Sequence, residues 1–283
     1  MTAFTSTAYS RDLGDELRRL RVTCTGLNGR ALATKLGWDP SKVSNIEHGR
    51  ARASEIDLTQ LFTACGKDLD FLEEFKRRYH HAFDQYFAQV PTELRTLAMT
   101  ESTAKKIIAY DVLMITGLLQ TEAYARELMI EKGIETPENI KKGVELRIQR
   151  QTIMRRQNRP ECVFYIHELA LQMRLGDAQL MEEQYLRLLF NTHMLRIVPV
   201  GARTAALLSK CILFEFEKAL PTVVSPTDTA MVFAQDSAAV ERARNTFARL
   251  DAIALDEEQS RKKLAEYVSG LRGDLHGSGT DLA

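Results

Sequence analysis

The sequence has few cysteines and no long apolar run, and these shortages exclude several classes of protein. Four cysteines are scattered among 283 residues, without a Cys-x-x-Cys pair or paired histidines nearby. This spacing argues against a structural zinc site and a disulfide framework, and it favours a reducing compartment. No window offers about 18 uninterrupted apolar residues, which a membrane-spanning helix needs. Residues 1–10 are polar and lack the pattern of a signal peptide, so we expect a cytoplasmic protein without membrane contact.

Charge is balanced over the whole chain but not along it. The 38 basic and 38 acidic side chains give a formal net charge of zero, which argues against strong attraction of the whole protein to nucleic acid. Between Arg11 and Arg52, however, nine basic residues stand against five acidic ones, a local net charge of +4. A chain of 283 residues is expected to form two domains. We therefore interpret it as a basic N-terminal module attached to a domain that does not bind nucleic acid.

The N-terminal region carries the signals of four short helices. The first is indicated by apolar residues at intervals of four, three and four: Leu13, Leu17, Leu20 and Cys24. Polar capping residues and glycines then bound three more helices: Asn28 to Gly37, Asp39 to Gly49, and Ser54 to Gly66. Two short helices joined by a tight turn that contains glycine are the pattern of a helix-turn-helix domain.

The segment from Asp39 to Gly49 has the chemistry of a helix that reads a DNA major groove. Pro40 suits the first turn of this helix, and Val43 and Ile46 recur at the spacing of its inward face. Polar side chains then remain for DNA: Ser41, Lys42, Ser44 and Asn45. The alternative is a helical bundle that shares this pattern, since serine and asparagine are also common on exposed surfaces.

These residues also resemble a known family, the Cro/repressor-type (XRE) regulators. The resemblance is carried by Gly26-Leu27, Ala31-Leu32-Ala33, Leu36-Gly37, Lys42-Val43-Ser44 and Ile46-Glu47-His48-Gly49. It implies that Ser41, Ser44 and Asn45 face base edges. It places phosphate contacts at Arg30, Lys42, Arg50 and Arg52. It also implies an internal ion pair between Arg21 and Glu47, although the stretch from Arg21 to Leu27 is one residue longer than the family's usual spacing.

Beyond the helix-turn-helix pattern the chain changes character. We predict a helix-turn-helix domain at 12–75, a linker helix at 76–96, a regulatory domain at 97–272 and a disordered tail at 273–283. In the regulatory domain, apolar spacing predicts helices at 101–110, 121–132 and 138–157. Short β-rich runs predict strands at 162–166, 195–200, 212–216, 222–224 and 230–233. The expected fold class is α+β: an all-α five-helix repressor-type domain followed by a mixed α/β regulatory domain.

The regulatory domain resembles a domain of unknown function found behind a helix-turn-helix in actinobacterial regulators, including the WhiJ-like ones. The matching segments are Gly117–Thr121, Tyr124–Arg126, Arg147–Gln151 and Leu195–Pro199. Thr116 stands where typical members have proline. The resemblance implies a DNA-binding regulator, often paired with a small acidic protein encoded nearby in an antitoxin-like arrangement, and it supplies no agreed ligand.

The sequence offers no complete catalytic motif. His167-Glu168 begins a metalloprotease motif, but Leu171 occupies the place of the second histidine, so two ligands cannot face one zinc ion. No phosphate-binding loop and no Gly-x-Ser-x-Gly turn are present. We therefore predict no enzyme activity, no metal and no cofactor. A run of arginines can bind an acidic ligand or form a solvated helix face: Arg147, Arg150, Arg155, Arg156 and Arg159.

The leading hypothesis is a homodimeric, sequence-specific transcriptional regulator whose C-terminal domain senses a small molecule or a protein. Three alternatives stay open. A peptide-responsive regulator built from helical repeats fits poorly with the predicted strands and the lack of a 34-residue repeat. An enzyme carrying a DNA-binding module requires catalytic residues assembled from distant positions. An interaction protein, finally, uses its second domain only to hold a small partner.

Overall fold

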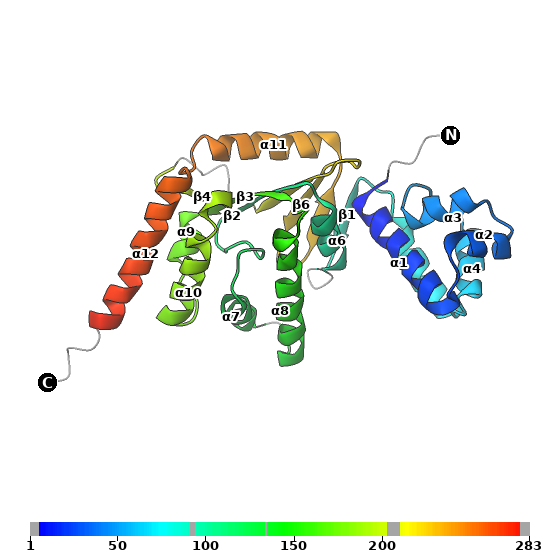
Figure 1. Cartoon of the computed structure of the whole chain (residues 1–283), viewed down its shortest axis with the longest axis horizontal. Coiled ribbons are helices and arrows are strands. Elements are labelled where there is room, and N and C mark those ends of the chain that lie inside the picture. The colour runs from blue at the N-terminus through cyan, green and yellow to red at the C-terminus, as the bar shows by residue number, and fades with distance from the viewer. Residues whose placement is uncertain (1–5, 91–93, 134, 203–209, 278–283) are drawn as a thin grey trace.

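Two parts make up the computed structural model, which describes residues 6–90, 94–133, 135–202 and 210–277: an N-terminal helical domain and a larger domain built on a β-sheet (Figure 1). The helical domain contains α1 (Ala8–Thr25), α2 (Gly29–Leu36), α3 (Pro40–Glu47), α4 (Glu55–Ala64) and α5 (Leu69–His80). This arrangement, five helices followed by a mixed α/β domain, confirms the predicted α+β fold class.

Local signals fix the ends of the short helices. The Asn28 side chain accepts a hydrogen bond from the Ala31 backbone N–H at 2.9 Å and begins α2. Asp39 accepts from Ser41 at 2.7 Å and begins α3. Such caps satisfy backbone donors that have no partner within the helix. Gly37 ends α2 with a φ of 67°, a left-handed conformation that glycine adopts without steric cost.

The sheet has seven strands in the order β1-β7-β6-β5-β2-β3-β4. Their bounds are β1 (Tyr86–Gln89), β2 (Lys106–Asp111), β3 (Glu161–His167), β4 (Leu195–Val198), β5 (Cys211–Glu215), β6 (Thr222–Pro226) and β7 (Met231–Ala234). Strands β2, β3 and β4 are parallel, whereas β5, β6, β7 and β1 join them in an antiparallel arrangement. The sheet is therefore mixed, with β2 at the change from parallel to antiparallel pairing.

Helices cover both faces of the sheet. One face carries α11 (Ser237–Asp251), which buries Val240, Phe247 and Leu250 against it (Figure 1). The remaining helices of this domain are α6 (Arg95–Thr103), α7 (Glu122–Lys132), α8 (Pro137–Gln151), α9 (Glu168–Gln172), α10 (Ala178–Leu189) and α12 (Glu257–Gly277), with short 3-10 turns η1 (Thr152–Arg155) and η2 (Thr192–Met194). Helices α6, α7, α8, α10 and α12 lie on the side opposite α11 (Figure 1).

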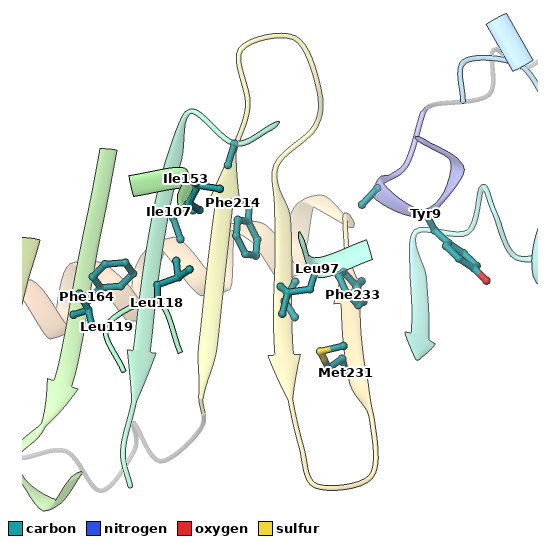
Figure 2. Close-up of a cluster of buried hydrophobic side chains, with 14 of the residues drawn as sticks. Tyr9, Leu97, Ile107, Leu118, Leu119, Ile153, Phe164, Phe214, Met231 and Phe233 are labelled. Carbon is teal, nitrogen blue, oxygen red and sulfur yellow. The ribbon is translucent and has the colours of Figure 1, made fainter. Parts of the chain in front are cut away.

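One hydrophobic core runs through both domains. Tyr9 of α1 stacks on Phe87 of β1 with ring centroids 4.7 Å apart, and Phe87 stacks on Phe233 of β7 at 4.6 Å. Tyr9 lies beside the sheet edge in Figure 2, where Phe233, Leu97 and other side chains of the sheet core are drawn. The first helix therefore belongs both to the helical domain and to its contact with the sheet.

Two predictions about the boundary regions were wrong, and a third, the disordered tail at 273–283, was wrong for residues 273–277. The predicted helix at 101–110 is instead the end of α6 followed by β2, because the β-branched Ile107 and Ile108 pair with strands on both sides. The predicted linker helix at 76–96 ends with α5 at His80, and β1 then pairs with β7. The predicted disordered tail begins inside α12, and residues 278–283 lie outside the described residues.

Candidate DNA-binding site

Helix α3 presents one buried side and one exposed side. Val43 and Ile46 are buried, at 1% and 2% exposure, and they anchor the helix to the domain. Ser41 and Ser44 are exposed on the other side, and Asn45 is half-buried beside them. A helix of eight residues with a polar outer side has the size and chemistry to enter a major groove.

His48 extends this polar side and was not among the DNA contacts predicted from the sequence. It is exposed and follows Ser41 by seven residues and Ser44 by four, so helical periodicity alone was the signal that pointed to it. Its Nδ1 lies 2.7 Å from the Ser44 carbonyl oxygen. Because a carbonyl only accepts, Nδ1 carries a proton in this contact, and in the neutral imidazole Nε2 is then an acceptor.

The ion pair expected between Arg21 and Glu47 is present and buried. Arg21 donates from Nε and Nη2 to the two carboxylate oxygens of Glu47, at 2.6 and 2.9 Å. Its remaining Nη1 donates to the Leu27 carbonyl at 2.6 Å, and the hydrogen bonding to Glu47 raises the pKa of Arg21. One guanidinium thus ties α1 to the end of α3 and to the turn before α2.

The four predicted phosphate contacts divide into two pairs. Arg30 and Arg50 are exposed at the start of α2 and directly after α3, and neither forms an ion pair with any residue that the structure describes. Lys42 instead pairs with Asp57 at 2.6 Å and lies over the Trp38 ring. Arg52 donates to the His80 carbonyl at the end of α5 and lies over Phe83. Lys42 and Arg52 therefore join elements of the domain itself.

A cluster of polar side chains connects α1 of the helical domain to α6 of the sheet domain. Asp12 accepts from Thr96 at 2.6 Å and pairs with Arg95 at 2.8 Å, both residues of α6. Glu16 pairs with Arg95 at 2.7 Å and with Arg78 of α5 at 2.9 Å. Burial raises the pKa of Asp12 despite these partners. For Glu16 burial acts in the same direction, but the two arginines outweigh it and lower the pKa of Glu16.

In the sheet domain, three glutamines hold the Gly117–Thr121 segment in place. Gln120 donates to the Ile115 carbonyl at 2.7 Å. Gln151 of α8 donates to the Gly117 and Gln120 carbonyls at 2.9 and 2.8 Å. Gln184 of α10 bonds both Leu119 and Thr121. Because the bonds from Gln151 and Gln184 reach backbone groups, they fix the path of the segment beside α8 and α10.

The His167-Glu168 pair has a structural role. His167 ends β3 and accepts a hydrogen bond from the Leu169 N–H at 3.2 Å, as the cap of α9. Glu168 pairs with Lys263 of α12 at 2.9 Å and accepts from Tyr267 at 3.1 Å. Within the described ranges, no three His, Cys, Asp or Glu side chains gather as metal ligands, and no helix is long and apolar enough to cross a membrane. All four cysteines are free thiols.

Comparison with protein families assigns both domains. Residues 94–266 match the family model described as a domain of unknown function, DUF5753. This chain belongs to the DUF5753 family. In this DUF5753 protein, residues 12–75 also match a helix-turn-helix domain, which includes α2 and α3 and indicates a DNA-binding regulator. No curated protein and no solved structure matches the chain.

Proposed function

We propose that this DUF5753 protein is a sequence-specific transcriptional regulator of the Cro/repressor type that binds double-stranded DNA as a homodimer. The polar side of α3 carries the proposal, because Ser41, Ser44, Asn45 and His48 share the outer side of a helix anchored by buried residues. Two-fold symmetry places the two copies of α3 in half-sites about 34 Å apart, one helical turn of DNA.

The side chains of α3 divide by the DNA groups they suit. The Asn45 amide carries a donor and an acceptor, the pattern that pairs with the edge of adenine. His48 Nε2 accepts from an exocyclic amine of adenine or cytosine. Arg30 and Arg50 bind phosphates on either side of the groove, since both guanidinium groups are exposed and without an acidic partner in the part of the chain described.

The sheet domain senses a small molecule or a protein partner in this proposal. The position of α6 supports this sensing role, because the helix contacts both domains. Its Arg95 and Thr96 contact α1, and its Glu101 pairs with Arg150 of α8. Helix α1 in turn packs on the end of α3, so a displacement of α6 reaches the DNA-binding helix through contacts. An acidic protein is the second candidate effector, because exposed arginines follow α8: Arg155, Arg156 and Arg159. We assign the chain no catalytic activity.

Selection of DNA from a random library by the full-length protein tests the DNA-binding part. Binding to the selected operator and to random DNA is then compared by fluorescence anisotropy at fixed salt. Asn45→Ala is expected to reduce the ratio of the two affinities about tenfold, in line with a base contact of about 1–3 kcal/mol. The matched control Asn245→Ala changes an exposed asparagine of α11 and leaves the ratio unchanged. If a triple variant with Ser44→Ala, Asn45→Ala and His48→Ala still discriminates the operator from random DNA as the wild type does, the assignment of α3 is disproved.

A further inference from the structure

A cavity of about 520 Å³ lies on the face of the sheet opposite α11. Its floor is apolar and comes from the sheet: Ile107, Phe164, Ile212 and Met231. Leu97 of α6 and Leu118 close it from the helical side, and both lie over the sheet in Figure 2. Cavities of roughly 300–1,000 Å³ with an apolar lining and a few polar groups are the usual form of a small-molecule site.

Two of the charged groups in this cavity are neutralised within the protein. Glu101 of α6 pairs with Arg150 of α8 through two hydrogen bonds of 2.5 and 2.7 Å. Asp111, at the end of β2, pairs with Lys210. Each carboxylate therefore has its own cation and is not available to compensate a further positive charge.

Arg147 of α8 is the largely buried cation in this cavity that has no acidic partner among the described residues, whereas Lys132 and Asp228, which also line it, are exposed. Its Nη1 donates to the neutral amide oxygen of Gln120 at 2.6 Å, and its Nε is inaccessible to solvent and without an acceptor. Burial, with the nearby charge of Arg150, lowers the pKa of Arg147 to about 10, so the group is still charged at neutral pH. An uncompensated buried charge is costly to the folded protein, and a bound anion removes that cost.

We propose that this cavity binds a small amphipathic anion, with its carboxylate or phosphate head group on Arg147 and its apolar part against Phe164 and Met231. A guanidinium group suits both head groups, because its planar fork donates two parallel hydrogen bonds. The apolar floor excludes a highly polar ligand, and the buried guanidinium without an acidic partner favours a negatively charged head group. The inference rests on the proposed function, since this ligand is then the effector that the sheet domain senses.

Isothermal titration calorimetry of the full-length protein with octanoate, octyl phosphate and octanol tests the proposal. At least one anion is expected to bind ten times more tightly than octanol, and the tighter anion identifies the head group. Arg147→Met is expected to weaken that anion at least tenfold and to leave octanol unchanged. The matched control Arg156→Met alters an exposed arginine just beyond α8 and changes neither. Equal binding of octanol and both anions, or an unaltered anion affinity in Arg147→Met, overturns the proposal.

A second measurement does not depend on the folding of a variant. The methyl resonance of Met231 in protein labelled at methionine methyl groups, assigned through Met231→Leu, is expected to shift on saturation with the bound anion. A Met231 signal that stays fixed overturns the placement of the ligand. Operator affinity measured in parallel separates the two proposals. Anion binding through Arg147 without any effect on operator affinity supports the site and contradicts sensing, whereas operator binding by a protein that binds neither anion overturns the site alone.

Discussion

The backbone of Gly14 in α1 lies directly against the carbonyl group of Glu47 at the end of α3. A β-carbon at Gly14 would be 2.6 Å from the Glu47 carbonyl oxygen, closer than real contacts of this kind. The carboxylate of the same glutamate is held by Arg21, also from α1. Backbone contact and ion pair together mean that α1 determines where α3 lies, the helix that we propose binds DNA.

Substitution of Gly14 by alanine therefore moves α3 or strains it. Gly14→Ala is expected to destabilise the protein by about 1–3 kcal/mol, the usual cost of overpacking, and to weaken operator binding. Urea unfolding and fluorescence anisotropy measure the two effects. The control is Gly270→Ala in α12, where a β-carbon meets nothing within 4 Å and helix propensity predicts a gain of about 0.5–1 kcal/mol. Equal stabilities of the two variants would contradict this account of α1.

Loss of one partner of the Arg21–Glu47 pair leaves a buried charge alone. Glu47→Met is expected to cost about 3–5 kcal/mol in the free energy of unfolding, and the double change Arg21→Met/Glu47→Met less than the single one. The control is Glu122→Ala, which breaks the exposed pair of Glu122 with Arg126, 2.8 Å apart, and costs at most about 1 kcal/mol. A double variant less stable than Glu47→Met would show that packing, not charge, governs this contact.

The sequence predicted those elements whose signals are local. The ends of α2 and α3 depend on Asn28 and Asp39, which bond backbone groups two or three residues away, so the pattern alone was sufficient. Strand β2 was missed because a helical spacing was extended over 101–110, whereas α6 ends at Thr103 and the β-branched Ile107 and Ile108 belong to β2. The buried environment of Arg147 was equally out of reach, since Gln120 and the sheet create it, whereas a run of arginines predicts only a charged helix face.

The residues predicted to contact phosphates should fall into two groups in experiment, one that affects DNA binding and one that affects stability. Arg30→Gln is expected to weaken operator and random DNA alike and to reduce the salt dependence of binding by about one ion, without a change in stability. Lys42→Met is expected to lower stability instead, because it leaves Asp57 without the lysine. Burial acts against the charge of Asp57, and hydrogen bonds from Lys42 and Ser54 keep its pKa below the usual value. DNA titrations at several salt concentrations and urea unfolding distinguish the variants. If Lys42→Met is as stable as the unaltered protein and its binding depends less on salt, the predicted phosphate contact of Lys42 is supported instead.

The two carboxylates of α1 that face α6, Asp12 and Glu16, have pKa values shifted in opposite directions by the fold. The pKa of Glu16 is lowered, so its contribution to stability is complete above the unfolded-state value of about 4.3 and is lost as the pH falls through the folded-state value. Asp12 has a raised pKa, so its ionisation weakens the fold as the pH rises above about 3.9. Urea unfolding between pH 7 and 3 should show a smaller loss in Glu16→Gln and a larger one in Asp12→Asn. The same slope in both variants would contradict the assignment.

The stacked rings of Tyr9, Phe87 and Phe233 at the domain boundary make the stability of the helical domain depend on its contact with the sheet. Phe87 is 7% exposed and lies between Tyr9 and Phe233, so Phe87→Ala removes two ring contacts and leaves a cavity. We expect a loss of about 3–5 kcal/mol in the free energy of unfolding and faster tryptic cleavage after Arg77 or Arg78. Phe190→Ala, at a position 79% exposed, is the control and should change stability by less than about 0.5 kcal/mol. The polar contacts of Asp12 and Glu16 join α1 to α5 and α6 independently of β1. If Phe87→Ala is cleaved as slowly as the unaltered protein, these polar contacts hold the two domains together without the rings.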